Sequence, residues 1–324
     1  MRAAVYRRYG GPEVVSVEIV PRPRPGPGEV LLRVHASTVS SGDARVRSLR
    51  VPTGFGLLSR AALGFFGPRK PVLGTELAGE VVALGDGVTD YALGERVAAY
   101  PGVALGCHAE YRTMPVKGNI ARLPDSISFE QGAALAFGGT AALHFLRDAA
   151  KLQSGERVLV IGASGAVGAA AVQLAKHFGA SVTGVTSTAN VELVRGLGAD
   201  RVVDYAREPL FGAGDAYDVI FEAVGVHAYA ECRAGLANGG RLILCAGSVP
   251  QILGSLVRTI GTTHRVLAGG APERPADLAL LVSLAEAGRY APPIDRTYPL
   301  ERITEAHAYV DTGRKRGNVV VTMG

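Results

Sequence analysis

The chain is poor in several features that would place it in other classes of protein. Its 324 residues include only three cysteines, Cys107, Cys232 and Cys245, which are too few and too scattered for a disulfide framework. No apolar run reaches the roughly 18 residues that a membrane span needs. The segment Met1–Arg8 lacks the apolar core of a signal peptide. We therefore expect a protein of the reducing cytoplasm that has no membrane span.

Lysine is also scarce, since only five of the 34 basic residues are lysines. The formal net charge is +5, but the arginines are scattered and form no basic block of the kind that binds nucleic acid. Hydrophobic residues make up 48% of the chain and charged residues 19%, which is typical of a folded globular protein. We expect no nucleic-acid partner, and the length predicts about two domains.

The first third of the chain consists of short β-branched or alternating segments separated by turns, a pattern that predicts strands. Together these strands suggest a small irregular β-barrel, and the tail Asn318–Thr322 is expected to return to it as a further strand. The other expected strands are Ala3–Tyr6, Val14–Ile19, Val30–Ala36, Leu77–Leu84 and Arg96–Ala99.

From about residue 128 the pattern changes. Gln131–Arg147 predicts a helix broken at Gly138–Gly139, and strands then alternate with helices, which implies a doubly wound parallel sheet. The expected strands are Arg157–Ile161, Ser181–Val185, Arg201–Val203, Asp218–Glu222, Arg241–Cys245 and His264–Leu267. The expected helices are Val167–Phe178, Val191–Leu197, Tyr229–Leu236 and Ala276–Ala287.

The most informative segment is the glycine-rich turn Gly162–Gly168. It follows an apolar strand and opens a helix-prone run of small residues, so backbone N–H groups converge where a pyrophosphate fits. This context predicts a dinucleotide site, and Ser164, Gly165, Ala166 and Val167 should face the pyrophosphate. A close-packed turn without a ligand is the alternative.

The residues after the second strand of this fold bear on the choice of cofactor. An acidic side chain near Ser187 would bind the ribose 2′-hydroxyl of NAD, but Thr186–Asn190 contains no carboxylate. Its hydroxyls and amide can donate hydrogen bonds to a phosphate, which favours NADP(H), with Thr186, Ser187 and Thr188 as contacts. No arginine or lysine stands in this run, and the residues can instead cap the next helix.

Several short motifs in a fixed order resemble the medium-chain dehydrogenase/reductase superfamily, in its zinc-independent, quinone-oxidoreductase-like branch. The resemblance covers nearly the whole chain and implies a GroES-like catalytic domain over 1–125, completed by 270–324, and a Rossmann nucleotide-binding domain over 126–269. It also suggests a homodimer. The motifs are Pro25–Val30, Gly74–Val81, Gly94–Val97, Gly139–Ala141, Gly162–Gly168 and Lys315–Val320.

The positions that hold the catalytic zinc in zinc-dependent relatives carry other residues here. By this resemblance the ligands would fall at Ser40, at Thr75 and near Ala136–Gly138, none of which supplies a cysteine, histidine or carboxylate. We therefore expect no metal and treat Cys107–His108 as a structural pair. Without a Lewis acid, hydride transfer needs an acceptor that is already activated, such as a quinone or an enone.

The resemblance also places Ser40 and Asp43 in the substrate cleft. Ser40 would donate to the developing oxyanion and Asp43 would orient it or relay a proton; alternatively, Ser40 merely replaces a ligand and Asp43 caps the following turn. Further cofactor contacts are expected at strand ends, in the tail and near the adenine, although each can be ordinary turn chemistry. These contacts are Thr140, Tyr205, Val224, Ala246, Gly247, Leu267, Gly269 and Asn318.

The segment Val51–Pro71 concentrates apolar residues between glycines in an expected surface loop. It can form a lid over the cleft, contact a membrane surface, or pack on the barrel or in a dimer contact. For the whole chain, the sequence favours an NADPH-dependent reductase of quinones or activated alkenes. The alternatives are a non-catalytic NADPH-binding or redox-sensing protein and an alcohol dehydrogenase.

Overall fold

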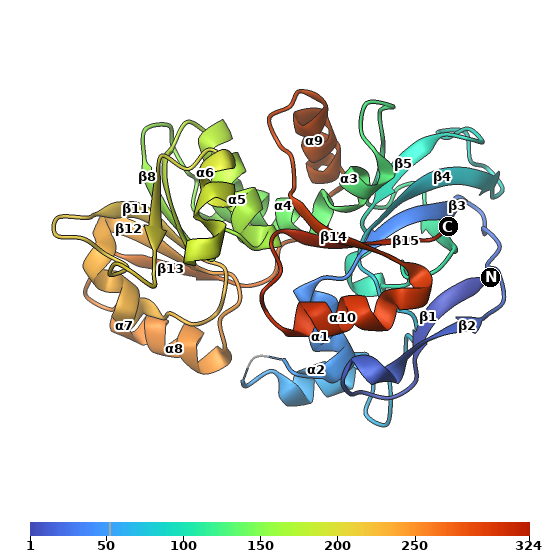
Figure 1. Cartoon of the computed structure of the whole chain (residues 1–324), viewed down its shortest axis with the longest axis horizontal. Helices are drawn as coiled ribbons and strands as arrows, with labels where there is room; N and C mark the ends of the chain where they lie inside the picture. The colour runs from blue at the N-terminus through green and yellow to red at the C-terminus, as the bar shows by residue number, and fades with distance from the viewer. Residues whose placement is uncertain (52) are drawn as a thin grey trace. The chain divides into compact units, whose positions relative to one another are not determined.

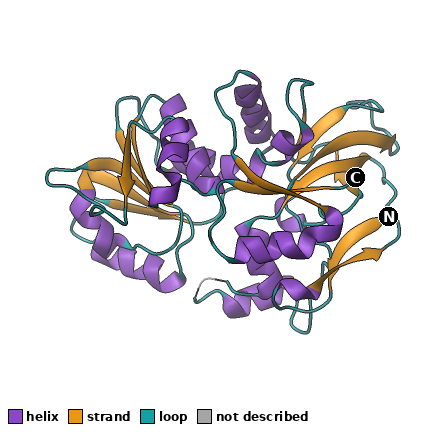
Figure 2. Cartoon of the chain, in the orientation of Figure 1, coloured by secondary structure: helices purple, strands orange, loops and turns teal. Residues whose placement is uncertain are grey.

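The computed structural model of this protein describes residues 1–51 and 53–324, which form two compact units. The first, unit 1, consists of residues 1–51, 56–137 and 273–324, and unit 2 consists of residues 138–272 together with 53–55. Figure 1 shows the course of the chain, and Figure 2 shows that each unit combines helices with strands. In the described part of the chain, no helix is long and apolar enough to cross a membrane.

Unit 1 is built on a seven-stranded sheet. Along it lie β14 (Ile294–Pro299), β15 (Asn318–Thr322), β3 (Glu29–Thr38), β4 (Leu77–Leu84), β5 (Arg96–Ala99) and β7 (Ile120–Arg122), while β6 (Tyr111–Pro115) pairs with β3. A separate antiparallel pair joins β1 (Arg2–Tyr6) to β2 (Val15–Ile19). The tail strand β15 pairs with β3 and with β14, so the predicted return of the chain to its first part is confirmed.

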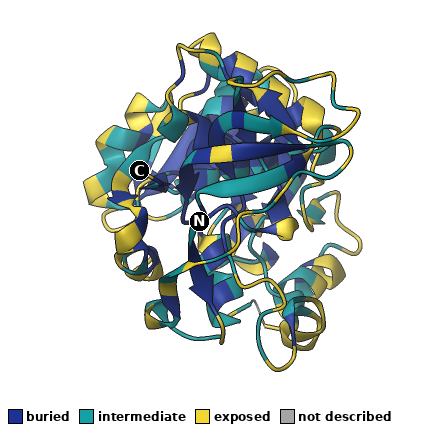
Figure 3. Cartoon of the chain, turned by 90° about the vertical axis from the view of Figure 1, so that its right-hand side faces the viewer, coloured by how far each residue is buried: buried dark blue, intermediate teal, exposed yellow. Residues whose placement is uncertain are grey.

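The core of unit 1 lies between this sheet and its helices. Leu32, Leu77, Val97 and Val319 are fully buried in one apolar cluster, and Figure 3 shows the strands near the C-terminus largely buried. The helices are α1 (Ser41–Ser48), α2 (Gly56–Leu63), α3 (Phe129–Ala133), α9 (Pro275–Glu286) and α10 (Ile303–Asp311).

Unit 2 is a six-stranded parallel sheet in the order β10-β9-β8-β11-β12-β13, which is the doubly wound order of dinucleotide-binding folds. The helices α5 and α6 lie on one side of the sheet, and α7 and α8 on the other (Figure 1). The strands are β8 (Arg157–Ile161), β9 (Ser181–Thr186), β10 (Arg201–Asp204), β11 (Tyr217–Glu222), β12 (Leu236–Leu244) and β13 (Arg265–Ala268). The helices are α5 (Ala166–His177), α6 (Val191–Gly196), α7 (Tyr229–Cys232) and α8 (Val249–Arg258).

Small residues let α5 approach the sheet closely. Ala169, Ala170 and Ala171 are fully buried, and a Cβ at Gly184 in β9 would lie 2.4 Å from Val194 of α6. Larger side chains at these positions would push the helices away from the sheet. The alternation of apolar strands with small-residue helices therefore specifies this unit, and its predicted class is confirmed.

The sequence predicted a helix over Gln131–Arg147 with a break at Gly138–Gly139, and the position of this break was wrong. The interruption falls between α3 and α4 (Ala136–Leu143), and a π-helical segment, His144–Ala149, follows. The glycines predicted to break the helix lie inside α4, where a Cβ at Gly138 would come within 2.5 Å of the carbonyl oxygen of Ala166. Gly138 thus permits a close approach of two backbones.

Two further expectations need correction. The helix predicted over Tyr229–Leu236 ends in a 3₁₀ turn at Gly235, because Leu236 already pairs with Tyr217 as the first residue of β12. In the expected loop Val51–Pro71, residues 56–63 form the helix α2, while Pro52 lies outside the described residues.

Candidate functional site

The glycine-rich turn joins β8 to α5 and leaves the start of the helix open. Gly162 has a φ of +80°, and a Cβ at Gly168 would lie 2.1 Å from the carbonyl oxygen of Gly162, so both positions require glycine. Gly165 is the residue before α5, and no side chain of the described residues caps the helix there. The first N–H groups of α5, from Ala166 onward, are therefore available to an anion.

The turn lies where the strand order of unit 2 reverses. The strand β8 pairs with β9 on one side and with β11 on the other, and ligands of doubly wound sheets bind beside this point. The parallel registers align Ile161, Val185, Glu222, Leu244 and Ala268 across the sheet. The structure thus brings together, near one edge of the sheet, the predicted strand-end residues Thr186, Val224, Ala246, Gly247, Leu267 and Gly269.

A buried carboxyl group fixes the turn after β11. Glu222 accepts hydrogen bonds from the backbone N–H groups of Val224, Gly225 and Val226 at 3.2, 2.7 and 3.3 Å. Burial raises the pKa of Glu222, while these three donors act in the opposite direction. Val224 and Gly225, where φ is +90°, are therefore held in a fixed conformation beside the strand end.

The predicted hydroxyl residues form one connected cluster. Ser164 Oγ accepts hydrogen bonds from Thr186 Oγ1 at 3.0 Å and from Asn190 Nδ2 at 3.2 Å, and Asn190 Nδ2 also lies 3.2 Å from Ser187 Oγ. The glycine-rich turn and the end of β9 are therefore linked through side chains. Sequence reasoning named four of these positions but could not show that they touch.

The run Thr186–Asn190 contains no carboxylate, as the sequence shows, but one reaches it from the neighbouring strand. Asp204 pairs with Thr186 in the register of β10 and β9, and its Oδ2 accepts from Thr188 Oγ1 at 2.6 Å. The Thr188 hydroxyl is the largest influence that lowers the pKa of Asp204. The parallel pairing of two strands brings Asp204 here, and a search limited to the residues after β9 misses it.

A cation also reaches this region, although none stands in the run that follows β9. Arg207 Nε lies 3.4 Å from Asp204 Oδ2, and its side chain is largely exposed. Tyr205, predicted near the adenine, is exposed as well, and its backbone N–H donates to the carbonyl of Thr186 at 3.1 Å. Arg207 and Asp204 are functional candidates that sequence reasoning missed.

Two further predicted cofactor contacts lie in different units. Thr140 is buried within α4, in the part of that helix that belongs to unit 2. Asn318 begins β15 in unit 1 and is buried, and its Nδ2 donates to the carbonyl of Pro293 at 3.2 Å. The structure describes each position within its own unit, and their roles toward a cofactor stay predictions.

The predicted catalytic pair, Ser40 and Asp43, closes the start of α1. Asp43 Oδ2 accepts from the Ser40 N–H at 2.8 Å and from Ser40 Oγ at 2.6 Å, and Ser40 Oγ accepts from the Asp43 N–H at 3.1 Å. Asp43 Oδ1 accepts from the N–H of Gly74 at 3.0 Å. This reciprocal arrangement is a capping box, and both side chains are buried. The two residues interact directly, and Asp43 caps α1.

Next to Ser40 and Asp43 lies a buried acid that sequence reasoning did not single out. Glu76 accepts from Thr38 Oγ1 at 2.5 Å and from the N–H groups of Ala136 and Phe137 at 3.1 and 2.7 Å, so it closes the start of α4. Burial raises the pKa of Glu76 to about 7. The neighbouring Thr75 hydroxyl is buried and has no hydrogen-bond partner among the described residues.

The side chains that could bind a metal ion are dispersed in the described part of the chain. Within residues 1–51 and 53–324, no three histidine, cysteine, aspartate or glutamate side chains are grouped so that they could hold a metal ion. Cys107 and His108 are both buried, burial raises the pKa of the Cys107 thiol, and His108 Nε2 lies 2.8 Å from the carbonyl oxygen of Thr38.

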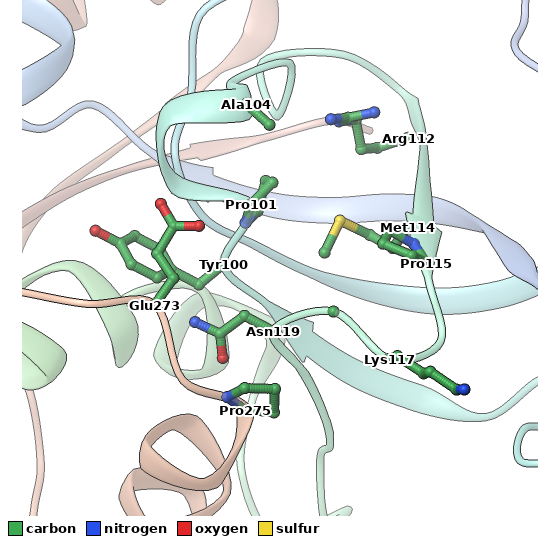
Figure 4. Close-up of a pocket in the computed structure, with 11 residues that line it drawn as sticks. Tyr100, Pro101, Ala104, Arg112, Met114, Pro115, Lys117, Asn119, Glu273 and Pro275 are labelled. Carbon is green, nitrogen blue, oxygen red and sulfur yellow. The ribbon is translucent and has the colours of Figure 1, made fainter.

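A cavity of about 280 Å³ lies elsewhere in unit 1. Figure 4 shows Asn119, Tyr100 and Glu273 on one side of it, and Arg112 and Lys117 on another. The Asn119 amide is buried and makes no hydrogen bond with any described residue. This cavity contains none of the predicted catalytic or cofactor residues, and nothing in the sequence pattern pointed to it.

Comparisons with known proteins agree with this architecture. Residues 26–125 match the family described as alcohol dehydrogenase GroES-like domain, and residues 197–321 match the family described as zinc-binding dehydrogenase. The chain is 31% identical to the chloroplastic NADPH-dependent alkenal/one oxidoreductase of Arabidopsis thaliana, across 99% of this chain and 79% of that protein. It is also 31% identical to the quinone oxidoreductase of Rattus norvegicus, across 100% and 98%.

A solved structure supports the fold. The quinone oxidoreductase of Coxiella burnetii superposes with a TM-score of 0.87 over 100% of this chain and 99% of that one, at 24% identity. The predicted class, a GroES-like domain with a Rossmann-like parallel sheet, is confirmed. The chain belongs to the medium-chain dehydrogenase/reductase superfamily, in its quinone-oxidoreductase-like branch, and is an oxidoreductase of a family that uses nicotinamide cofactors.

Proposed function

We propose that this protein reduces quinones or activated alkenes with NADPH and without zinc. The observation that carries the proposal is the open start of α5 beside a cluster of hydroxyl, amide and guanidinium groups in unit 2. The names of the two relatives, a quinone oxidoreductase and an NADPH-dependent alkenal/one oxidoreductase, support the substrate class.

The preference for NADPH rests on Arg207 and its neighbours. The exposed guanidinium lies 3.4 Å from Asp204 Oδ2, which also accepts from the Thr188 hydroxyl. Ser187 precedes Thr188 in the chain, and its Oγ lies 3.2 Å from Asn190 Nδ2. A phosphate attracts such a donor set, because charge-assisted hydrogen bonds to guanidinium are strong. We assign the ribose 2′-phosphate to Arg207, Ser187 and Thr188, and the pyrophosphate to the backbone of residues 164–167.

The donor set of unit 1 suits an oxyanion better than a zinc ion. Ser40 and Thr75 offer hydroxyls, while the carboxyl oxygens of Asp43 and Glu76 already accept hydrogen bonds from the protein's own groups. Bound NADPH supplies a hydride to the acceptor. We assign Ser40 as the hydroxyl that donates to the developing oxyanion, and Asp43 as the residue that positions it. In the structure the Ser40 hydroxyl donates to Asp43 Oδ2 at 2.6 Å, so this role requires its one proton to turn from Asp43 to the oxyanion. The overall reaction consumes one proton with each hydride.

The proposal is tested by following NADPH absorbance with a panel of quinones, enones and enals. We expect consumption of NADPH with some of these acceptors and weaker activity with NADH. Binding of NADPH without turnover of any acceptor would identify a non-catalytic binding protein. Stoichiometric zinc in the purified protein, with activity toward alcohols, would identify an alcohol dehydrogenase.

We also propose that the two parts of the chain have the separate functions that the family implies. Residues 1–125, completed by 270–324, form the catalytic part, and residues 126–269 form the NADP-binding part. The match of residues 26–125 to a GroES-like domain and the strand order of unit 2 support this division. We further propose a cytoplasmic homodimer, which light scattering of the purified protein tests directly.

A further inference from the structure

One long segment of unit 1 carries charge of a single sign. Between Asp43 and Glu76 the chain has six basic residues and no acidic one. The middle of this segment is apolar, and four of its large side chains project into solvent: Leu57 and Leu58 of α2, and Phe65 and Phe66 of the following turn, where Phe66 is fully exposed. We call these four residues the exposed ridge.

The turn that carries the two phenylalanines is held in place by hydrogen bonds. Tyr9 Oη donates to the carbonyl of Gly64 at 2.9 Å, Arg60 Nη1 donates to the carbonyl of Phe65 at 3.2 Å, and the N–H of Arg69 donates to the carbonyl of Leu63 at 2.8 Å. Gly64 has a φ of +128°, which strongly favours glycine. The exposure of Phe65 and Phe66 is therefore built into the local structure.

Cations flank the exposed ridge. Arg60 donates to the carbonyl of Phe65 and the backbone of Arg69 to that of Leu63, so both arginines lie at the turn that carries the ridge. Lys70 Nζ lies 3.2 Å from the carbonyl oxygen of Val103, a residue that is itself exposed and apolar.

Two acids lie near these elements. Glu18 pairs with Arg7, whereas Glu273 accepts from the neutral N–H of Val103 at 3.1 Å and keeps its charge, so the cations of the segment outnumber the acids near it. The surface around the exposed ridge thus combines apolar area with positive charge, a combination that suits anionic lipid headgroups above an acyl layer.

We propose that the exposed ridge docks on the surface of an anionic phospholipid bilayer. Phe65 and Phe66 enter the boundary between headgroups and acyl chains, while Arg60, Arg69 and Lys70 contact lipid phosphates. A second copy of the chain fits this surface less well, because a two-fold contact through the exposed ridge would set like charges close together. In one respect the inference rests on the proposed function: docking gives the enzyme access to lipophilic quinones dissolved in the bilayer.

The test is co-sedimentation with vesicles of phosphatidylcholine, alone or mixed with phosphatidylglycerol. We expect the full chain to bind the mixed vesicles, and binding to weaken with added salt. The double variant Phe65→Ser/Phe66→Ser should lower the partition coefficient at least about tenfold. The variant Arg69→Gln/Lys70→Gln should lower it about fivefold for each cation removed. Leu93→Ser is the control, because Leu93 is similarly exposed on the turn between β4 and β5, away from α2 in Figure 1.

Three outcomes would overturn the docking proposal. The first is equal sedimentation of the wild type with neutral and anionic vesicles. The second is a partition coefficient that neither the phenylalanine variant nor the Arg69/Lys70 variant changes. The third is a wild type that binds no vesicles and a phenylalanine variant that no longer forms a dimer. The last result would identify the exposed ridge as a subunit interface. NADPH oxidation with a short water-soluble quinone is measured in parallel and should be equal in all variants. Its absence from the wild type contradicts the proposed function and leaves the vesicle result to stand by itself.

Discussion

The N-termini of α5 and α1 are both polar and lie beside predicted site residues. They differ in whether a side chain accepts hydrogen bonds from their backbone N–H groups. At α5 the preceding residue is Gly165, and no described side chain caps the helix. At α1 Ser40 and Asp43 bond reciprocally to each other's backbone, and Asp43 also accepts from Gly74. Free N–H groups attract an anion and satisfied ones do not, so the open start of α5 is the one we propose for the cofactor, whereas the bonds at the start of α1 hold the local fold.

The start of α4 extends the comparison. Glu76, just before β4, supplies the carboxyl group that accepts from Ala136 and Phe137, so a residue distant in sequence closes this helix. Two of the three helix starts are thus completed by acids of unit 1, whereas the start in unit 2 is left to glycine. The contrast separates helix starts that the protein's own side chains satisfy from the one that we propose binds the cofactor.

We expect the largest effect, on both stability and NADPH binding, from a substitution that adds a side-chain atom at the open start of α5. Gly168→Ala places a Cβ 2.1 Å from the carbonyl oxygen of Gly162, and neither backbone can move without displacing α5 from β8. We expect a loss of about 3 kcal/mol in the free energy of unfolding, together with loss of NADPH binding, measured by urea denaturation and fluorescence titration.

Gly165→Ala is the matched control for that variant. Its Cβ would lie 3.6 Å from the same carbonyl oxygen, at ordinary contact distance, and its φ of −80° suits any residue. The free energy of unfolding should change little. Equal losses in both variants would contradict the steric account of the turn.

Glu76 closes the start of α4 and titrates, so the free energy of unfolding should depend on pH. Burial raises the pKa of Glu76 from 4.5 to about 7, so between these values the unfolded chain releases a proton that the folded chain retains. The contribution of Glu76 to stability is therefore greatest below pH 4.5, falls as pH rises toward 7, and is flat above it. The total change is on the order of 3 kcal/mol. Urea denaturation of the wild type and of Glu76→Gln from pH 5 to pH 8 measures it, and identical slopes would contradict the assignment.

The cation beside the open start should set the choice of cofactor. Arg207→Ala removes the guanidinium near Asp204 and should weaken NADPH binding about tenfold or more while leaving NADH binding unchanged. Arg195→Ala is the control, since Arg195 is an exposed arginine of α6 that pairs with Glu192. Parallel losses for NADPH and NADH in Arg207→Ala would argue against a phosphate contact.

The smallest expected effect distinguishes a capping role of Ser40 from a role in stabilising the oxyanion. Ser40→Ala should lower the free energy of unfolding by about 1 kcal/mol through loss of a cap. Ser128→Ala removes the equivalent capping serine of α3 and should cost a similar amount. If Ser40 also donates to the oxyanion, only Ser40→Ala lowers kcat with an unchanged KM for NADPH. Equal kcat values in the two variants would assign Ser40 to structure alone.

The sequence pattern was sufficient to predict the elements that depend on residues close together in the chain. The strand β8, the glycine-rich turn and α5 follow from one run of residues. The tail was expected to return to the first part of the chain as a strand, but its pairing with β3 was not specified. The helix α8 was missed although its apolar residues recur at helical spacing, at Val249, Ile252, Leu253, Leu256 and Val257. The structure adds that Leu253, Leu256 and Val257 face solvent, which the spacing does not reveal.

Contacts between distant residues account for the rest. Asp204 reaches Thr188 only because β10 pairs with β9, and Glu76 reaches α4 across 60 residues of sequence. Asp204 forms no local motif, and Glu76 lies in the motif Gly74–Val81, which does not reveal its contact with α4. The capping role of Asp43 was foreseen as an alternative, because the spacing of Ser40 and Asp43 is local.

The most direct test of the central claim is NADPH oxidation by a simple benzoquinone, followed in protein that elemental analysis shows to be free of metal. The account predicts steady consumption of NADPH, slower consumption of NADH, and loss of both rates in Gly168→Ala. Failure to oxidise NADPH with any quinone or enone, or a rate that rises in proportion to added zinc, would contradict it.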